Sequence, residues 1–250
     1  MIIYPACVRI GDRSLEVVTG GAGSPSVIFE AGQNEDLRTW RQLPGRVACL
    51  STVVAYDRLG NGRSSPANGN RSALDCVFDL RQLLHALKVK PPFVIVGHSL
   101  GGTFATVFAS VFHHETTGLV LVDPTPYDWR ESLLPMLSSQ LQHLASEYDS
   151  KSPEGKGWAE TARQARNAQV DPSIWVTVIS AGHPLPGGRE VPEYTRALQT
   201  KHQILAYGSA HGRHLVANDA PHHIHHQSPD LIFREISSMI YGIRSQSRNT

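Results

Sequence analysis

The chain has 250 residues, a formal net charge of +1 and 40% hydrophobic residues. This length suits one large α/β domain or two small ones, and the apolar fraction is enough for a sizeable core. A charge so close to zero gives no strong field toward polyanions. We therefore expect no nucleic acid and no membrane as partners.

The N-terminus and the cysteines bear on the cellular compartment. No apolar run reaches the roughly 18 residues that span a bilayer. Residues 1–18 lack the basic start, long apolar stretch and cleavage site of a signal peptide. Cys7, Cys49 and Cys76 are too few and too scattered for a disulfide framework or a CxxC zinc pattern. We expect a cytoplasmic protein that keeps its N-terminus and holds its thiols reduced and buried.

The first half of the chain alternates between strand-like and helix-like stretches. β-rich runs at 14–20, 26–32 and 51–57 indicate strands, and 91–97 is an unbroken apolar run typical of a parallel strand buried on both faces. Residues 72–89 carry leucines and valines on one helical face, with Ser72 placed to cap the start. A small apolar helix at 100–112 and a buried strand at 118–123 follow.

The second half begins with a change of pattern. No strand-like run occurs from 124 to about 170, where 130–148 and 153–168 indicate helices. Strands resume at 173–180 and 211–217, and an amphipathic helix at 229–243 closes the pattern. Strand–helix alternation implies right-handed βαβ units. We predict an α/β fold with a mostly parallel, doubly wound sheet. Its core comprises 1–125 and 171–250, and 126–170 form an inserted helical cap over the sheet's carboxyl edge.

The stretch "VIVGHSLGG" (94–102) matches the pattern G-x-S-x-G, with Gly97, Ser99 and Gly101. A serine on a sharp, strained turn between strand and helix needs glycines two residues before and after it, because Cβ atoms would clash there. The turn exposes the hydroxyl above the positive end of the next helix. The motif follows an apolar strand and opens an apolar helix, so Ser99 is the predicted nucleophile.

At this motif the chain resembles the α/β-hydrolase superfamily over nearly its whole length, as a capped, esterase- or lactonase-like serine member. The resemblance implies an eight-stranded sheet. "IFEAG" followed by Gln33 resembles the loop after the family's third strand, which implies an oxyanion hole made by the N–H groups of Gln33 and Leu100. "YDRLGNGRS" (56–64) is similar to the family's D-x-x-G-x-G-x-S turn, whose role is mainly structural.

The general base is sought among the histidines of "APHHIHHQSPD" (220–230). In the family the base follows the last strand, and the surrounding apolar residues and the Pro229–Asp230 pair are in register with His222. His223 is the alternative. A zinc site of His222, His225 and His226 would leave the serine motif unexplained, so we expect no metal and no cofactor. His98, beside the nucleophile, is expected to pack or donate a hydrogen bond.

The catalytic triad that the resemblance implies also needs an acid, and this chain has none at the position where most of the family carries it. No Asp or Glu promptly follows the strand at 173–180, where most of the family carries it. The strand at 118–123 instead ends in Asp123. Some relatives, including fungal zearalenone lactonases and certain dehalogenases, take their acid from this position. Asp123 is therefore expected to orient the histidine, with Asp128 and Glu190 as alternatives.

These residues predict a serine hydrolase that cleaves a carboxylic ester or lactone through an acyl-enzyme. A serine at the turn between strand and helix argues against the dehalogenases and epoxide hydrolases of this fold, which use aspartate there. We expect a small, fairly hydrophobic substrate as the partner, contacted by cap residues Tyr127, Trp129, Met136 and Trp158. A carbon–carbon bond hydrolase and a slow-turnover ligand receptor remain alternatives, and a homodimer is left open.

Overall fold

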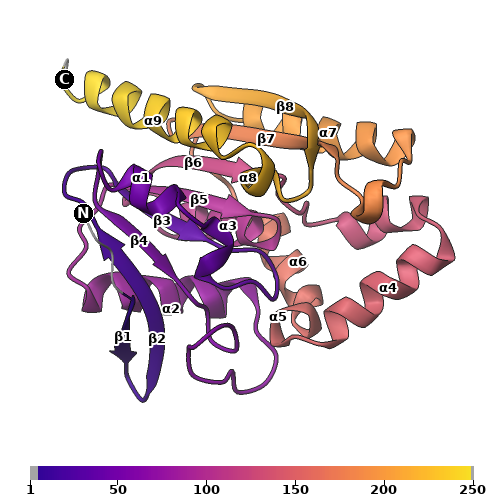
Figure 1. Ribbon diagram of the computed structural model, residues 1–250, viewed down its shortest axis with the longest axis horizontal. Coiled ribbons are helices and arrows are strands. Elements are labelled where there is room, and N and C mark those ends of the chain that lie inside the picture. Colours follow the sequence, from indigo (N-terminus) through magenta and orange to yellow (C-terminus); the bar gives the residue numbers. More distant parts are fainter. Residues whose placement is uncertain (1–4, 249–250) are drawn as a thin grey trace.

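The computed structural model describes residues 5–248, and these contain one eight-stranded sheet (Figure 1). The strand order is β1-β2-β4-β3-β5-β6-β7-β8. The pairs β1–β2 and β2–β4 are antiparallel, and all other pairs are parallel. The strands are β1 (Pro5–Ile10), β2 (Arg13–Gly20), β3 (Ser26–Glu30), β4 (Val53–Tyr56), β5 (Phe93–His98), β6 (Thr116–Val122), β7 (Trp175–His183) and β8 (Gly212–Pro221). The predicted fold class is confirmed.

Helices cover both faces of this sheet (Figure 1). One face packs against α1 (Leu43–Val47) and α9 (Pro229–Gln246). The other packs against α2 (Ala73–Ala86), α3 (Leu100–Val111) and α7 (Pro192–Tyr207). Side chains alternate between the two cores along each central strand. This explains why β5 and β6 have nearly continuous apolar sequences.

The sequence prediction missed several elements, including β1, α1 and α7. β1 is a mostly exposed edge strand, so one face of it carries no apolar pattern. In α7 the buried residues are Tyr194, Leu198, His202 and Ala206, a single narrow stripe at every fourth position. The rest of that helix is largely polar, and a histidine within the stripe weakens its apolar signal. Pro192 at the first turn was the available start signal.

The middle segment is helical, but its helices are more broken than predicted. Pro135 interrupts the expected helix at 130–148, which becomes two short turns, Trp129–Leu133 and Leu134–Met136, followed by α4 (Ser139–Ser150). The second helix divides at Gly157 into α5 (Pro153–Lys156) and α6 (Trp158–Asn167). Figure 1 shows α4 at the end of the molecule remote from β1, whereas α6 packs against α2 and α3. The division into a core and a cap at 126–170 stays a prediction.

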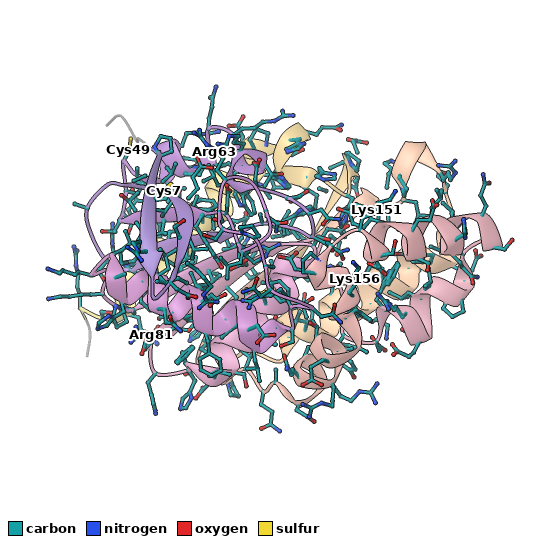
Figure 2. The ribbon with its side chains drawn as sticks, turned by 90° about the horizontal axis from the view of Figure 1, so that it is seen from below. Cys7, Cys49, Arg63, Arg81, Lys151 and Lys156 are labelled. Atoms are coloured by element: carbon teal, nitrogen blue, oxygen red, sulfur yellow. The ribbon has the colours of Figure 1, made fainter. Side chains whose placement is uncertain are left out.

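The cysteines differ from the expectation of buried thiols. Cys76 is buried in α2, but Cys7 and Cys49 are exposed, and all three are free. Figure 2 shows the two exposed cysteines at the end of the molecule away from Lys151 and Lys156. Among residues 5–248, no helix combines the length and apolar character needed to cross a membrane. The expectation that the protein keeps its N-terminus concerns a segment whose residues 1–4 lie outside the described residues.

Candidate active site

Ser99 occupies the sharp turn between β5 and α3 with φ 52° and ψ −122°. This is a left-handed region that a residue with a Cβ atom rarely adopts. A Cβ atom on Gly97 would lie 2.6 Å from the carbonyl oxygen of Gly101. One on Gly101 would overlap the carbonyl oxygens of Glu30 and Ala31. The two glycines therefore permit the close packing that holds the serine in this strained conformation.

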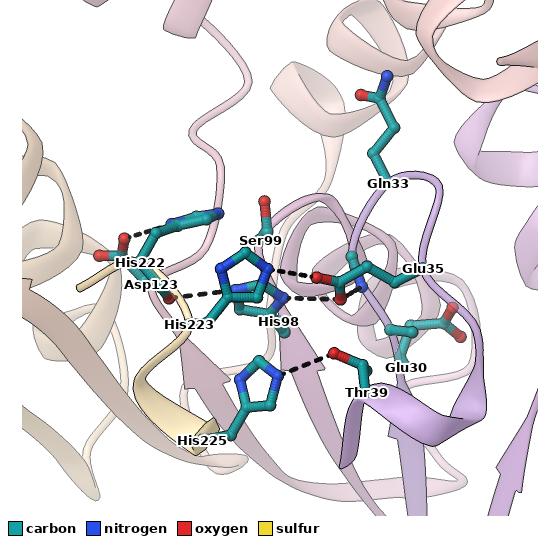
Figure 3. A network of polar contacts seen from close by, with 12 residues as sticks. Glu30, Gln33, Glu35, Thr39, His98, Ser99, Asp123, His222, His223 and His225 are labelled. Atoms are coloured by element: carbon teal, nitrogen blue, oxygen red, sulfur yellow. Dashed lines mark hydrogen bonds and ion pairs between the residues drawn. The ribbon is translucent and has the colours of Figure 1, made fainter. Parts of the chain in front are cut away.

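Asp123 directly follows β6, and its carboxylate lies against His222, which follows β8 (Figure 3). His222 Nδ1 is 2.6 Å from Asp123 Oδ2, while Asp123 Oδ1 accepts the N–H of Ala181 at 2.9 Å. Because an ionised carboxylate only accepts hydrogen bonds, Nδ1 carries the proton and Nε2 is left with a lone pair. The other two candidate acids lie elsewhere: Asp128 pairs with Lys201, and the exposed Glu190 pairs with His183.

The electrostatics of this pair favour an ionised acid and a more basic imidazole. Burial alone would raise the pKa of Asp123, but the hydrogen bond and charge of His222 outweigh it, so the pKa is lowered. Burial alone would lower the pKa of His222, but the hydrogen bond and charge of Asp123 outweigh that, so the pKa is raised. Each group thus stabilises the charged form of the other.

Ser99 and His222 line the same cavity, but no hydrogen bond joins them within residues 5–248. The Ser99 hydroxyl instead lies 3.4 Å from Thr125 Oγ1. Thr125 is fixed beside the turn because its N–H donates to the Ser99 carbonyl at 3.0 Å and its own carbonyl accepts from Thr103. In this conformation the Ser99 hydroxyl is therefore directed to Thr125 and not to His222.

The two residues expected to form an oxyanion hole, Gln33 and Leu100, line the same cavity as Ser99. Leu100 is the first residue of α3, so its N–H has no acceptor within the helix. The N–H of Gln33 has no acceptor among the described residues. The carbonyl of Gly32 accepts from buried Arg58 at 2.6 Å. In a trans peptide the next N–H points the opposite way, away from that arginine. The Gln33 side chain points away from Ser99, toward Asp149 and Ser152 (Figure 3).

Arg58 was missed as a site residue, although its motif was recognised. Its guanidinium is buried and contacts Glu30 at 2.7 Å and Glu154 at 2.6 Å, and it donates to the carbonyls of Ala31 and Gly32. Buried charges are tolerated when they are paired and hydrogen-bonded. This cluster therefore fixes the loop after β3 and connects it to α5 of the middle segment.

The cavity has a volume of about 760 Å³ and is mostly apolar away from Ser99. Its apolar wall contains Trp129, Leu137, Leu141, Leu144, Trp158, Leu185 and Leu198. Trp129 and Trp158 were predicted as substrate contacts, and both line the cavity. Tyr127 and Met136 were also predicted, but neither lines it, and both are exposed to solvent. The leucines of α4 and α7 were not identified because their position depends on how these helices pack together.

The side chains of the other histidines in residues 220–230 have different hydrogen-bond partners from the side chain of His222. His223 Nε2 lies 2.7 Å from Glu35 Oε1, His225 Nε2 lies 3.1 Å from Thr39 Oγ1, and His226 Nε2 lies 2.9 Å from the Thr39 carbonyl. The structure therefore does not gather His222, His225 and His226 around one point. It does bring ligand atoms of Glu35, His98 and His223 within 4.8 Å of one another.

Glu35 was missed because no spacing pattern relates this loop residue to the distant histidines. Its Oε2 atom lies 3.0 Å from His98 Nδ1 and accepts the N–H of Gly32 at 2.8 Å. Burial alone would raise the pKa of Glu35, but hydrogen bonds with His223 and His98 outweigh it, so the pKa is lowered and the group is ionised. Burial lowers the pKa of His98 despite its contact with Glu35.

His202 is a further buried histidine that the sequence did not reveal, because α7 was not predicted. Its Nε2 atom lies 2.7 Å from the carbonyl oxygen of Pro124, and its Nδ1 atom lies 2.8 Å from Ser180 Oγ. A carbonyl only accepts, so Nε2 carries the proton and Nδ1 accepts from the serine hydroxyl. His202 therefore fixes the backbone immediately after Asp123.

Residues 25–205 match the family model described as the alpha/beta hydrolase fold, and the chain belongs to this family. It is 26% identical over 216 residues to YqjL, an uncharacterized protein of Bacillus subtilis (strain 168), which covers 85% of this chain and 82% of that protein.

Solved structures give the same fold. A thermophilic esterase from Thermogutta terrifontis superposes with a TM-score of 0.67 and 17% identity, covering 97% of this chain and 99% of that one. The enol-lactonase from Burkholderia xenovorans LB400 has a TM-score of 0.67 and 18% identity, covering 94% and 100%.

Proposed function

We propose that this protein is a serine hydrolase that cleaves a carboxylic ester or lactone through an acyl-enzyme intermediate. The observation that carries the proposal is the 2.6 Å contact of His222 with the buried Asp123, in the cavity that also exposes Ser99. Esterase and enol-lactonase structures with the same fold support the choice of bond. A fold alone does not define a reaction, so the argument rests on the side chains.

The proposed reaction begins with rotation of the Ser99 hydroxyl from Thr125 toward His222 Nε2. Nε2 accepts the serine proton while Oγ attacks the substrate carbonyl, and Asp123 stabilises the resulting imidazolium. The N–H groups of Gln33 and Leu100 donate to the oxyanion. One such donor contributes roughly 3–4 kcal/mol to transition-state stabilisation.

Collapse of the tetrahedral intermediate releases the alcohol and leaves the acyl group on Ser99. The imidazolium of His222 gives its proton to the departing alkoxide. Water then loses a proton to Nε2, attacks the acyl carbon and releases the acid, and the proton returns to the serine oxygen. In a lactone, alcohol and acid remain in one product. No step requires a further co-reactant besides water.

The lining of the cavity supports a small, fairly hydrophobic substrate. Indole rings and leucine side chains form the wall away from Ser99. A cavity of about 760 Å³ accommodates a ligand well above the size of acetate. Burial of apolar surface contributes roughly 0.8 kcal/mol per CH₂ group. Esters with an acyl chain of several carbons should therefore bind more tightly than acetyl esters.

The experiment is turnover of p-nitrophenyl acetate and butyrate by the wild type and by Ser99→Ala. The proposal predicts multiple turnovers with the wild type, a preference for butyrate in kcat/KM, and loss of activity in the variant. The variant's melting curve should match the wild type, so that inactivity is not mistaken for unfolding. Full activity in Ser99→Ala contradicts the proposal.

Two rival functions predict different results in the same assay. A carbon–carbon bond hydrolase with the same triad should prefer a vinylogous diketone to either ester. A ligand receptor should show little multiple turnover but a clear ligand-induced rise in melting temperature. Either pattern would replace the ester-hydrolase assignment.

A further inference from the structure

A second group of polar side chains lies at the active-site cavity and takes no part in the proposed reaction. The Glu35 carboxylate faces two adjacent imidazoles: its Oε1 atom lies 2.7 Å from His223 Nε2, and its Oε2 atom lies 3.0 Å from His98 Nδ1 (Figure 3). The three side chains line the cavity. They come from the loop after β3, the end of β5 and the loop after β8, which only the fold brings together.

The hydrogen-bonding capacity of His98 does not match its surroundings. Its Nδ1 atom faces the Glu35 carboxylate, and its Nε2 atom faces the carbonyl oxygen of His222 at 3.2 Å. Both neighbours only accept hydrogen bonds, whereas a neutral imidazole has a single N–H. In either neutral tautomer, one ring nitrogen therefore presents a lone pair to an oxygen. A cation between His98 and Glu35 would remove this conflict.

From this geometry we propose that Glu35, His98 and His223 form a binding site for a divalent transition-metal ion, with Zn²⁺ as the probe. Imidazole nitrogen and carboxylate oxygen are ligands that zinc accepts, at about 2.0–2.2 Å. Tetrahedral ligands at that distance lie about 3.4 Å apart, so ligand atoms now within 4.8 Å of one another need only small rotations to meet one ion.

The groups around the three ligands suit this role. With a metal ion on His98 Nδ1, its Nε2–H would donate to the His222 carbonyl at 3.2 Å, and the N–H of Gly32 donates to Glu35. Metal-binding histidines commonly donate their second N–H to such a carbonyl. The side chains of His98, Glu35 and His223 are 1%, 15% and 45% exposed. The site is thus built from the buried side and open toward the cavity, where a fourth ligand can enter.

The proposed site differs from the zinc site considered in the sequence analysis, which would use His222, His225 and His226. His226 belongs to the alternative trio and to the same loop, but its Nε2 atom contacts Thr39 rather than Glu35. His226→Gln is therefore a matched control for His223→Gln. Both positions are partly exposed, so neither substitution leaves a large cavity in the core.

The test is calorimetric titration of ZnCl₂ into EDTA-treated, desalted protein, with melting curves to verify that each variant is folded. The wild type should bind one Zn²⁺ per chain. Glu35→Gln and His223→Gln should each weaken binding by more than about tenfold, since even the outer partners of metal ligands contribute 10- to 100-fold to affinity. His226→Gln should keep the wild-type affinity.

Three results would overturn the proposal: no specific binding by the wild type, unchanged affinity in both Glu35→Gln and His223→Gln, or loss confined to His226→Gln. The readout does not depend on esterase activity. A protein that hydrolyses no ester can still pass this test, and an active esterase can still fail it.

Discussion

Asp123→Asn is the substitution that most specifically challenges the choice of acid. Asparagine keeps the shape of the side chain and an oxygen for the Ala181 N–H, but it removes the charge beside His222. Unit charges whose centres are about 4 Å apart attract by about 4 kcal/mol at an effective dielectric constant of 20. At 1.36 kcal/mol per tenfold change in rate, this corresponds to a loss of about 10³ in kcat. The asparagine also no longer selects the correct imidazole tautomer, so kcat should fall by about 10³–10⁴ in total.

The assay is kcat for p-nitrophenyl butyrate at a fixed pH, with Asp128→Asn and Glu190→Gln as matched controls. The two controls remove carboxylates that pair with Lys201 and His183, and neither carboxylate contacts His222 among the described residues. Both should retain kcat within about threefold, because partly or fully exposed ion pairs outside the triad contribute little. The reasoning fails if Glu190→Gln or Asp128→Asn loses 100-fold while Asp123→Asn stays active.

Three further predictions concern pH and stability. The kcat/KM of the wild type, measured with EDTA present, should fall on the acid side with a pKa above 6.5, because Asp123 raises the pKa of His222 and the base must be neutral; in Asp123→Asn this acid limb should move to lower pH. Arg58→Met should lower the free energy of unfolding, measured by guanidinium titration, by about 3–5 kcal/mol, because two buried carboxylates lose their partner. The control Arg63→Met, at an exposed arginine, should change this free energy little. Equal stability of the two variants would contradict the prediction. Ser72→Ala removes the capping box of α2, so it should lower the free energy of unfolding by about 1 kcal/mol. The melting temperature should fall by about 2–4 °C while kcat stays unchanged. An unchanged melting temperature would count against a stabilising role of the cap.

Features encoded locally were predictable from the sequence. Strands buried on both faces read as apolar runs, and the glycines around Ser99 mark a turn that other residues cannot form. Ser72 was expected to cap a helix, and its side chain and that of Asp75 form a capping box at the start of α2. In each case the residues that cause the structure lie within a few positions of one another.

Features that depend on distant contacts were not predictable. Glu35 meets His98 and His223 only because two loops and the end of β5 converge at one edge of the sheet. Arg58 lay within a recognised motif, but nothing local indicates its contact with Glu154 in the middle segment. Tyr127 and Met136 were chosen as large apolar residues of the predicted cap, and the packing of the broken helices leaves them in solvent.

The central claim is that Ser99 is a nucleophile activated by His222, and covalent labelling tests it most directly. The protein is treated with a fluorophosphonate, and the adduct is located by peptide mass spectrometry in the wild type, Ser99→Ala and His222→Gln. The account predicts one adduct per chain on Ser99, none in Ser99→Ala, and labelling slowed by at least about 100-fold in His222→Gln, because general-base assistance contributes roughly 10²–10⁴. An unlabelled wild type, an adduct on another residue, or undiminished labelling of His222→Gln would contradict it.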